Sequence, residues 1–262
     1  VEAKPVMTTW DALLPGALAD KFDISVAATY DTPERREVVD FVNWTDSGLC
    51  YSVLKDSGLN TMADLNSADV KMIIGLGTGT EQTTRATLPL VDIEAIPPAP
   101  GTSFGQNLLL SGRADAVPFD SPMALAVERE FPDLKIIPGG AKGCIENPHA
   151  TREIGLFHLK NEPELGKFLQ AIATKWSSQL DEELYHWSDP VAQDELAGVD
   201  ADAAEVVQGI TIPPKGASAI LDNVRESGEL RVAVALALPW LGQNPSTNEL
   251  VGPAWTLAEK VA

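Results

Sequence analysis

The chain has 262 residues, 44% of them hydrophobic, and a formal net charge of −19. This length and apolar content suffice for one or two globular domains with a buried core. The negative charge argues against nucleic acid or an anionic membrane as a partner, because both attract basic surfaces. No apolar run reaches the length of a transmembrane helix, and the residues from Val1 onward lack a signal-peptide pattern. A mature or trimmed export product is therefore expected.

The first part of the chain alternates strand and helix signals. We expect a strand at residues 3–7, an amphipathic helix at 11–19 and a strand at 23–28. This βαβ rhythm is typical of an α/β domain with a parallel sheet.

A helix opening follows, and it brings the first candidate site residue. Thr32 suits the N-cap and Pro33 the first helical position. A helix start presents unpaired N–H groups, and Arg35 adds a planar fork of donors, so together they form a candidate anion site. The alternative is a solvated Arg35 paired with Glu34 or Asp31.

The apolar residues 49–55 are expected to form a strand, and the resemblance described below makes it a crossover into a second lobe. A Gly/Thr-rich turn at residues 75–80 follows a strand there, and its amides and hydroxyls offer an anion site. The third glycine of the turn is misplaced for a dinucleotide fingerprint, and no lysine follows as in a P-loop, so a nucleotide site is disfavoured. A tight turn that needs glycine only for packing remains the alternative. The expected elements of this lobe are helices at 60–65, from Glu81, at 103–111 and at 121–130, and strands from Val70 and at 93–96, 114–119 and 134–137.

The chain is then expected to return to the first lobe through a strand at residues 155–159 and a long helix at 162–184. That helix carries one apolar stripe, which indicates core packing. The stripe consists of Leu165, Phe168, Leu169, Ile172 and Trp176.

Two cysteines, Cys50 and Cys144, lie far apart without metal-type spacing, so we expect no zinc site. A disulfide between them and two free thiols both remain open.

Several segments resemble the extracellular solute-binding proteins that serve polar amino acid ABC transporters. The signature covers Phe22 to Phe41, including Thr32-Pro33-Glu34-Arg35. The helix Trp10 to Leu18 resembles the one that precedes this signature, and Leu109 to Val117 followed by Asp120 resembles the second-lobe segment. The resemblance covers most of residues 1–190 and implies an α/β fold of two lobes, each a mixed sheet flanked by helices, joined by a two-strand hinge.

The resemblance also implies a ligand site, and the residues at the matching positions have side chains and backbone groups that could form it. Arg35 would clamp an α-carboxylate, with backbone N–H groups of Tyr30 and of the turn at Gly79 and Thr80. The carbonyl of Ala28 and the carboxylate of Asp120 would take the α-ammonium, and Trp10 would wall the pocket. The alternatives are a helix cap for Asp120 and a core aromatic for Trp10. Opposite charges at both ends are what a buried zwitterion requires.

One segment stands in an unexpected place. Residues 221–234 resemble the first helix and strand of a mature family member, yet they lie near the C-terminus. We interpret the chain as circularly permuted, with a tandem protein trimmed to this window as the competing explanation. The expected division is 1–48, lobe 1; 49–140, lobe 2; 141–189, lobe 1; 190–216, a linker joining the ancestral ends; and 217–262, the ancestral N-terminal segment of lobe 1.

The sequence thus predicts a periplasmic or extracellular monomer that captures an amino acid or related zwitterion for an ABC transporter permease. It predicts no cofactor and no metal. A cyclohexadienyl-dehydratase-like enzyme is the alternative, but Met123 stands where those enzymes carry a glutamate, and Glu81 is the only nearby acid to replace it. A ligand-sensing module is a further alternative. Ala235 to Trp240 lack the acid that often follows the family's first strand, so the ligand's side chain is left open.

Overall fold

The computed structural model describes residues 1–97, 103–187, 203–244 and 246–262. The chain divides into two compact units. Unit 1 contains Val1–Asp46, Glu153–Trp187 and the described residues from 203 onward, and unit 2 contains Ser47–Arg152. Among the described residues, the backbone passes between the units on the strands β3 (Val39–Leu54) and β8 (His149–Leu159).

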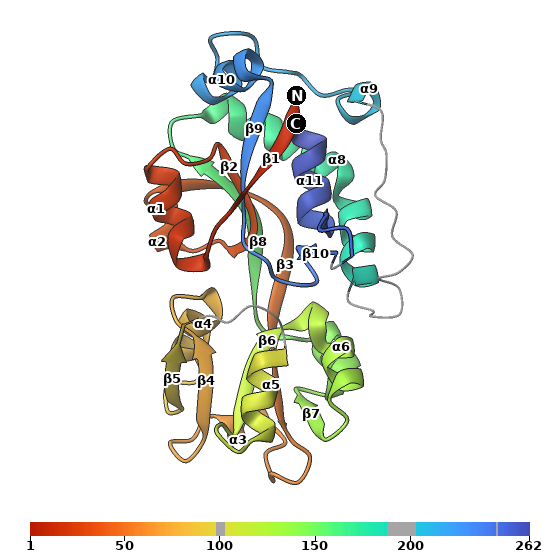
Figure 1. Cartoon of the computed structure of the whole chain (residues 1–262). Helices are drawn as coiled ribbons and strands as arrows, with labels where there is room; N and C mark the ends of the chain where they lie inside the picture. The colour runs from red at the N-terminus through yellow and green to blue at the C-terminus, as the bar shows by residue number, and fades with distance from the viewer. Residues whose placement is uncertain (98–102, 188–202, 245) are drawn as a thin grey trace. The chain divides into compact units, whose positions relative to one another are not determined.

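Unit 1 is built on a mixed sheet in the order β1-β9-β2-β8-β3 (Figure 1). Strand β9 lies between β1 and β2 and is parallel to both, whereas β2 is antiparallel to β8. The strands completing this sheet are β1 (Glu2–Met7), β2 (Ile24–Tyr30) and β9 (Glu229–Val234), and a separate hairpin pairs β10 (Gly242–Gln243) with β11 (Leu250–Val251).

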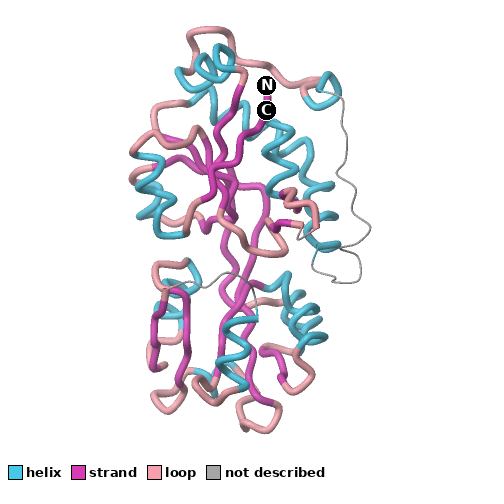
Figure 2. The backbone as a smooth tube through the Cα atoms, viewed as in Figure 1, coloured by secondary structure: helices cyan, strands magenta, loops and turns pink. Residues whose placement is uncertain are grey.

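Helices account for most of the remaining described residues of unit 1 (Figure 2). They are η1 (Trp10–Ala12), α1 (Leu13–Leu18), α2 (Pro33–Arg36), α8 (Pro163–Trp187), α9 (Ala203–Val206), α10 (Ala219–Ser227) and α11 (Pro253–Val261). Thr32 caps α2 and Pro33 begins it, as predicted.

The predicted stripe on α8 is core packing. Leu165, Phe168, Leu169 and Ile172 are buried in one cluster with sheet residues and with α11, and Trp176 packs against that cluster. Burial of such side chains supplies about 1.5–3 kcal/mol each. The stripe therefore holds the C-terminal helix α11 to the rest of unit 1.

The C-terminal segment is also joined to unit 1 by polar contacts. Arg231 on β9 donates from Nη2 to Asp23 Oδ1 and to Asp20 Oδ1, both at 2.7 Å. These carboxylates raise the pKa of the Arg231 guanidinium. Lys175 on α8 donates to the carbonyls of Glu205, Val206 and Gln208.

In unit 2 the second half of β3 carries the same sheet onward through further strands. Strand β3 pairs antiparallel with β6 and β7. Strand β4 lies between β6 and β5 and is parallel to both. The elements are β4 (Lys71–Gly75), β5 (Asp92–Ile96), β6 (Ala116–Asp120), β7 (Leu134–Ile137), α3 (Met62–Leu65), α4 (Gly79–Thr87), α5 (Ser103–Leu110), η2 (Ser121–Met123), α6 (Ala124–Glu130) and α7 (Gly140–Glu146).

Some element bounds differ from the predictions. Strand β3 begins at Val39, not at Leu49, because its first half pairs within unit 1. Helix α4 begins at Gly79, since Thr78 rather than a later residue is its N-cap. Helix α7 was not predicted. Residues 190–202 of the expected linker lie outside the described residues, and the rest of it contains α9.

Candidate ligand-binding site

The clearest candidate site residue in unit 1 is Arg35, on the one-turn helix α2. The Thr32 hydroxyl accepts from the Arg35 backbone N–H at 3.4 Å, which fixes the helix start. The Arg35 side chain returns across α2, and its Nη1 donates to the Tyr30 carbonyl at 2.7 Å. The guanidinium is therefore held at the end of β2.

The alternative predicted for Arg35 was an ion pair with Glu34 or with Asp31. Asp31 pairs with Arg36 instead, accepting from its Nε at 2.6 Å and also from its Nη2. Asp31 is thus the partner of Arg36 and not of the Arg35 guanidinium. Burial lowers the pKa of the Arg35 guanidinium, and the charge of Glu34 offsets part of that effect. A half-buried guanidinium in this state favours an anion beside it.

The other predicted residues of unit 1 lie on neighbouring elements. Ala28 and Tyr30 are buried on β2. Ala28 lies where the β2–β8 pairing is interrupted, between Ser25 and Thr29. Trp10 is partly buried in η1 and packs against an apolar cluster that includes Leu13. Trp10 therefore contributes to the hydrophobic core of unit 1, which agrees with the alternative that it is a core aromatic.

In unit 2 the Gly/Thr-rich turn opens helix α4. The Thr78 hydroxyl donates to the Gly75 carbonyl at 2.7 Å and accepts from the Glu81 backbone N–H at 3.1 Å. Gly79 and Thr80 are the first two residues of the helix, so their N–H groups belong to the set without intrahelical acceptors. The turn is therefore an ordered helix start.

Glu81 is committed to local contacts. Its Oε2 accepts from the Gly77 N–H at 2.8 Å, and its Oε1 accepts from Arg85 Nε at 3.0 Å. Met123, at the position where the related dehydratases carry a glutamate, is buried in an apolar cluster. These contacts give Glu81 a capping role and do not favour a general acid.

Asp120 ends β6 immediately before η2. It occupies the N-cap position, but its side chain makes no capping hydrogen bond, so the alternative of a helix cap is not supported. The next residue, Ser121, lies beside the first residues of unit 2: Ser47 Oγ and the Gly48 N–H are each 3.5 Å from Ser121 Oγ. These contacts tie the end of β6 to β3.

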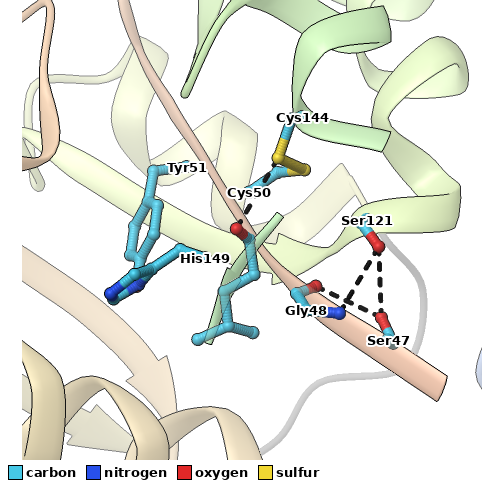
Figure 3. Close-up of a disulfide and its surroundings, with 8 residues drawn as sticks. Ser47, Gly48, Cys50, Tyr51, Ser121, Cys144 and His149 are labelled. Atoms are coloured by element: carbon cyan, nitrogen blue, oxygen red, sulfur yellow. Dashed lines mark hydrogen bonds between the residues drawn. A yellow bond between two sulfur atoms is a disulfide. The ribbon is translucent and has the colours of Figure 1, made fainter. Parts of the chain in front are cut away.

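Figure 3 shows a disulfide next to these contacts. Cys50 on β3 and Cys144 on α7 are bonded, with Cα atoms 5.9 Å apart, which resolves the choice that the sequence left open. Tyr51 follows, and its hydroxyl is 2.9 Å from His149 Nδ1. Burial raises the pKa of the Tyr51 phenol and lowers that of His149. The disulfide thus joins β3 to the helix that precedes β8.

Within unit 1 the structure brings Tyr30 and Arg35 into direct contact. Trp10, Ala28, Tyr30 and Arg35 belong to unit 1, whereas Gly79, Thr80 and Asp120 belong to unit 2. The pairing of Asp31 with Arg36 was missed, because residues five apart carry no helical pairing signal. No cluster of potential metal ligands occurs in the part of the chain that the structure describes. Nor does any helix within that part have the length and hydropathy to cross a membrane.

The chain is thus an α/β protein of two sheet-based units with an arginine at a helix start, and the comparisons identify its family. The model of bacterial extracellular solute-binding proteins, family 3, matches residues 1–251. The chain therefore belongs to that family.

Known relatives agree with this assignment. The octopine-binding periplasmic protein of Rhizobium meliloti is 30% identical over 159 residues, which cover 52% of this chain and 53% of the relative. The chain thus matches about half the length of that relative. An ancestral amino acid-binding protein, described as a precursor of cyclohexadienyl dehydratase, has a TM-score of 0.54 and 28% identity over 72% of this chain and 75% of its own. A mutant of ArgBP from T. maritima has a TM-score of 0.57 and 26% identity over 71% and 76%.

Proposed function

We propose that this chain captures an amino acid or a related zwitterion, with Arg35 as the clamp for its α-carboxylate. The observation that carries the proposal is the state of Arg35: its half-buried guanidinium is held by the Tyr30 carbonyl, and Asp31 bonds to Arg36 and not to Arg35. A guanidinium forms strong bidentate bonds to a carboxylate, and a half-buried one gains most from such a partner.

The remaining predicted residues supply the rest of the proposed site. Backbone N–H groups of Tyr30 and of the helix start at Gly79 and Thr80 would share the carboxylate. The Ala28 carbonyl and the Asp120 carboxylate would take the α-ammonium, and Trp10 would line the pocket. This assignment divides the ligand's contacts between the two units, so that closing of the lobes would depend on the ligand. Membership of the family supports it.

The proposed biological setting is uptake. The chain would act as a periplasmic or extracellular monomer that delivers its ligand to an ABC transporter permease. The family's description as extracellular and the periplasmic relative support this setting.

We further propose that residues 217–262 are the family's N-terminal segment, placed after the rest of the chain by circular permutation. The central, parallel position of β9 between β1 and β2 supports this order. If residue 262 were joined to residue 1, then β9, α11 and β1 would form a βαβ unit, which is the usual connection between parallel neighbours.

The function is tested by a thermal-shift screen of the common L-amino acids and related zwitterions on the wild type, Arg35→Ala and Arg225→Ala. A ligand at about a hundred times its Kd stabilises the fold by about 2.7 kcal/mol. We expect at least one hit that Arg35→Ala loses, because charge-assisted hydrogen bonds contribute about 1.5–3 kcal/mol, or roughly tenfold to a hundredfold in Kd.

Arg225→Ala is the matched control, because Arg225 is an arginine of the same unit whose partner is Asp222. It should keep the ligand-induced shift. A panel without any hit on a cooperatively melting wild type, or an equal shift in Arg35→Ala, would contradict the proposal.

A further inference from the structure

Four side chains of unit 1 form a hydrogen-bonded network around α2. Asp31 accepts from Arg36 through both of its oxygens and from Asn43 Nδ2 at 2.8 Å. The same Asn43 Nδ2 lies 2.8 Å from Glu153 Oε2. Asp31, Arg36, Asn43 and Glu153 are called the Asp31 network below.

Asp31 is the buried centre of this network. Its side chain is 6% exposed, whereas that of Arg36 is 49% exposed. A buried carboxylate without donors is strongly disfavoured, so the bonds from Arg36 and Asn43 constrain where Asp31 can lie. The Asp31 backbone N–H also donates to the Glu153 carbonyl at 3.1 Å. The end of β2 is therefore fixed from three sides.

The network also determines the geometry of α2. This helix has only four residues, and few internal bonds hold it, among them Arg36 N–H to the Thr32 carbonyl at 2.9 Å. The bond from Arg36 to Asp31 links the last residue of the helix to the residue before its N-cap. Arg35 lies inside this closed loop and is bonded back to Tyr30. Its guanidinium position thus depends on the loop.

The network extends to β3, on which the chain leaves unit 1, and to β8, on which it returns. Asn43 lies on β3, three residues before Asp46, the last residue of unit 1 on that strand. Glu153 on β8 is the first residue of unit 1 after the return. Asn43 is itself fixed: a Cβ on Gly155 would lie 2.5 Å from Asn43 Oδ1, so the amide packs directly on β8.

We propose that Asp31 is a positioning residue for ligand binding: it holds α2 against β3 and β8, and so sets the orientation in which Arg35 meets the ligand's carboxylate. This rests on the proposed function of Arg35. In this role Asp31 acts through Arg35 and not by contact with the ligand. Removing the Asp31 carboxylate disturbs Arg35 but leaves in place the groups that bind the other parts of the ligand. The protein then distinguishes less well between an α-carboxylate and a neutral α-carboxamide.

The test is titration calorimetry of the wild type, Asp31→Asn and Asp222→Asn. The probes are the common L-amino acids, tested singly, and the α-carboxamide of each one that the wild type binds. Asp222→Asn is the matched control, because it removes the carboxylate of another aspartate–arginine pair of unit 1. Arg36→Gln breaks the same ion pair from its exposed end, and it replaces Asp31→Asn should that variant fail to give a cooperative melt.

The expected result is a ratio of carboxamide Kd to amino acid Kd that falls by about tenfold in Asp31→Asn and is unchanged in Asp222→Asn. A general loosening of the site would weaken both ligands equally and leave the ratio unchanged, which would overturn the positioning role. An unchanged Kd for the amino acid would overturn it as well. If the wild type binds no amino acid, the proposed function falls first, and the Asp31 proposal with it.

Discussion

At the scale of single residues, His158 shows how burial in unit 1 is linked to pH. The imidazole is only 2% exposed on β8, and its Nδ1 is 2.8 Å from the Leu159 carbonyl. Burial lowers the pKa of His158 below its ordinary 6.5, and the Leu159 carbonyl together with nearby carboxylates offsets part of this shift. The folded state therefore holds a proton on this residue less readily than the unfolded state does.

The linkage gives a prediction with a definite sign. Because the folded pKa is depressed, the contribution of His158 to stability is full above pH 6.5 and is lost as the pH falls below 6.5. We expect urea unfolding to show a loss of stability from pH 7.5 to 5.5 that is smaller in His158→Asn, whose amide can still donate to Leu159. Equal losses in the two proteins would contradict the assignment.

The residues themselves were enough to predict where α2 starts, but not which distant residues bond to the side chains around it. Thr32 and Pro33 act on their own neighbours, so the cap and the first turn could be predicted from sequence. In the Asp31 network Asn43 bonds to Glu153, which lies 110 positions further along the chain, and no local pattern encodes that contact. The disulfide was left open for the same reason, since Cys50 and Cys144 are separated by 94 positions.

At the scale of elements, β3 and β8 pack closely on both sides of the division between the units. In unit 1 a Cβ on Gly155 would lie 2.6 Å from the Val42 carbonyl oxygen, and in unit 2 a Cβ on Gly48 would lie 2.9 Å from the His149 carbonyl oxygen. Glycine is required at both positions because any larger residue would separate the backbones.

This packing predicts the effect of Gly155→Ala. The added methyl group clashes with backbone and with Asn43, so we expect a loss of about 1–3 kcal/mol in the free energy of unfolding. Gly143→Ala in α7 is the control, since its Cβ would meet nothing closer than 3.8 Å and alanine favours a helix. Chemical denaturation measures both, and equal stability of Gly155→Ala and the wild type would refute the close-packing argument.

The elements that could be predicted are those with a strong internal pattern. The α8 stripe and the strand 70–75 depend on periodicity and apolar runs, and both occur. The first half of β3 was missed because Asp40, Asn43 and Asp46 interrupt its apolar residues, and it is a strand only through pairing with its neighbours. Helix α7 was missed because its two glycines, Gly140 and Gly143, weaken the helical signal.

At the scale of the whole molecule, the proposed circular permutation concerns the order of the segments that build unit 1. Both chain ends lie in unit 1, at β1 and α11, and Figure 1 marks them close together. Chain ends in such positions are where circular permutation is tolerated. The proposed permutation therefore needs no change in the packing of unit 1.

Moving residues 217–262 in front of residue 1 tests the proposed permutation. A chain that runs from residue 217 to 262, through a short Gly/Ser linker, and then from residue 1 to 189 should fold cooperatively and bind the same ligands with a Kd within about threefold. Circular dichroism, melting and calorimetry measure this. A rearranged chain that stays unfolded would mean that the segment 190–216 is required for the fold, and the permutation proposal would fail.

The central claim is that this chain recognises both charged ends of an amino acid. The most direct measurement is a calorimetric titration of the wild type with the tightest-binding amino acid of the screen, its α-carboxamide and its N-acetyl derivative. We expect 1:1 binding of the amino acid and a Kd at least about tenfold weaker for each derivative, because each derivative removes a charge that the proposed site pairs. Equal affinity for all three compounds would show that neither Arg35 nor Asp120 recognises the zwitterion, and would contradict the account.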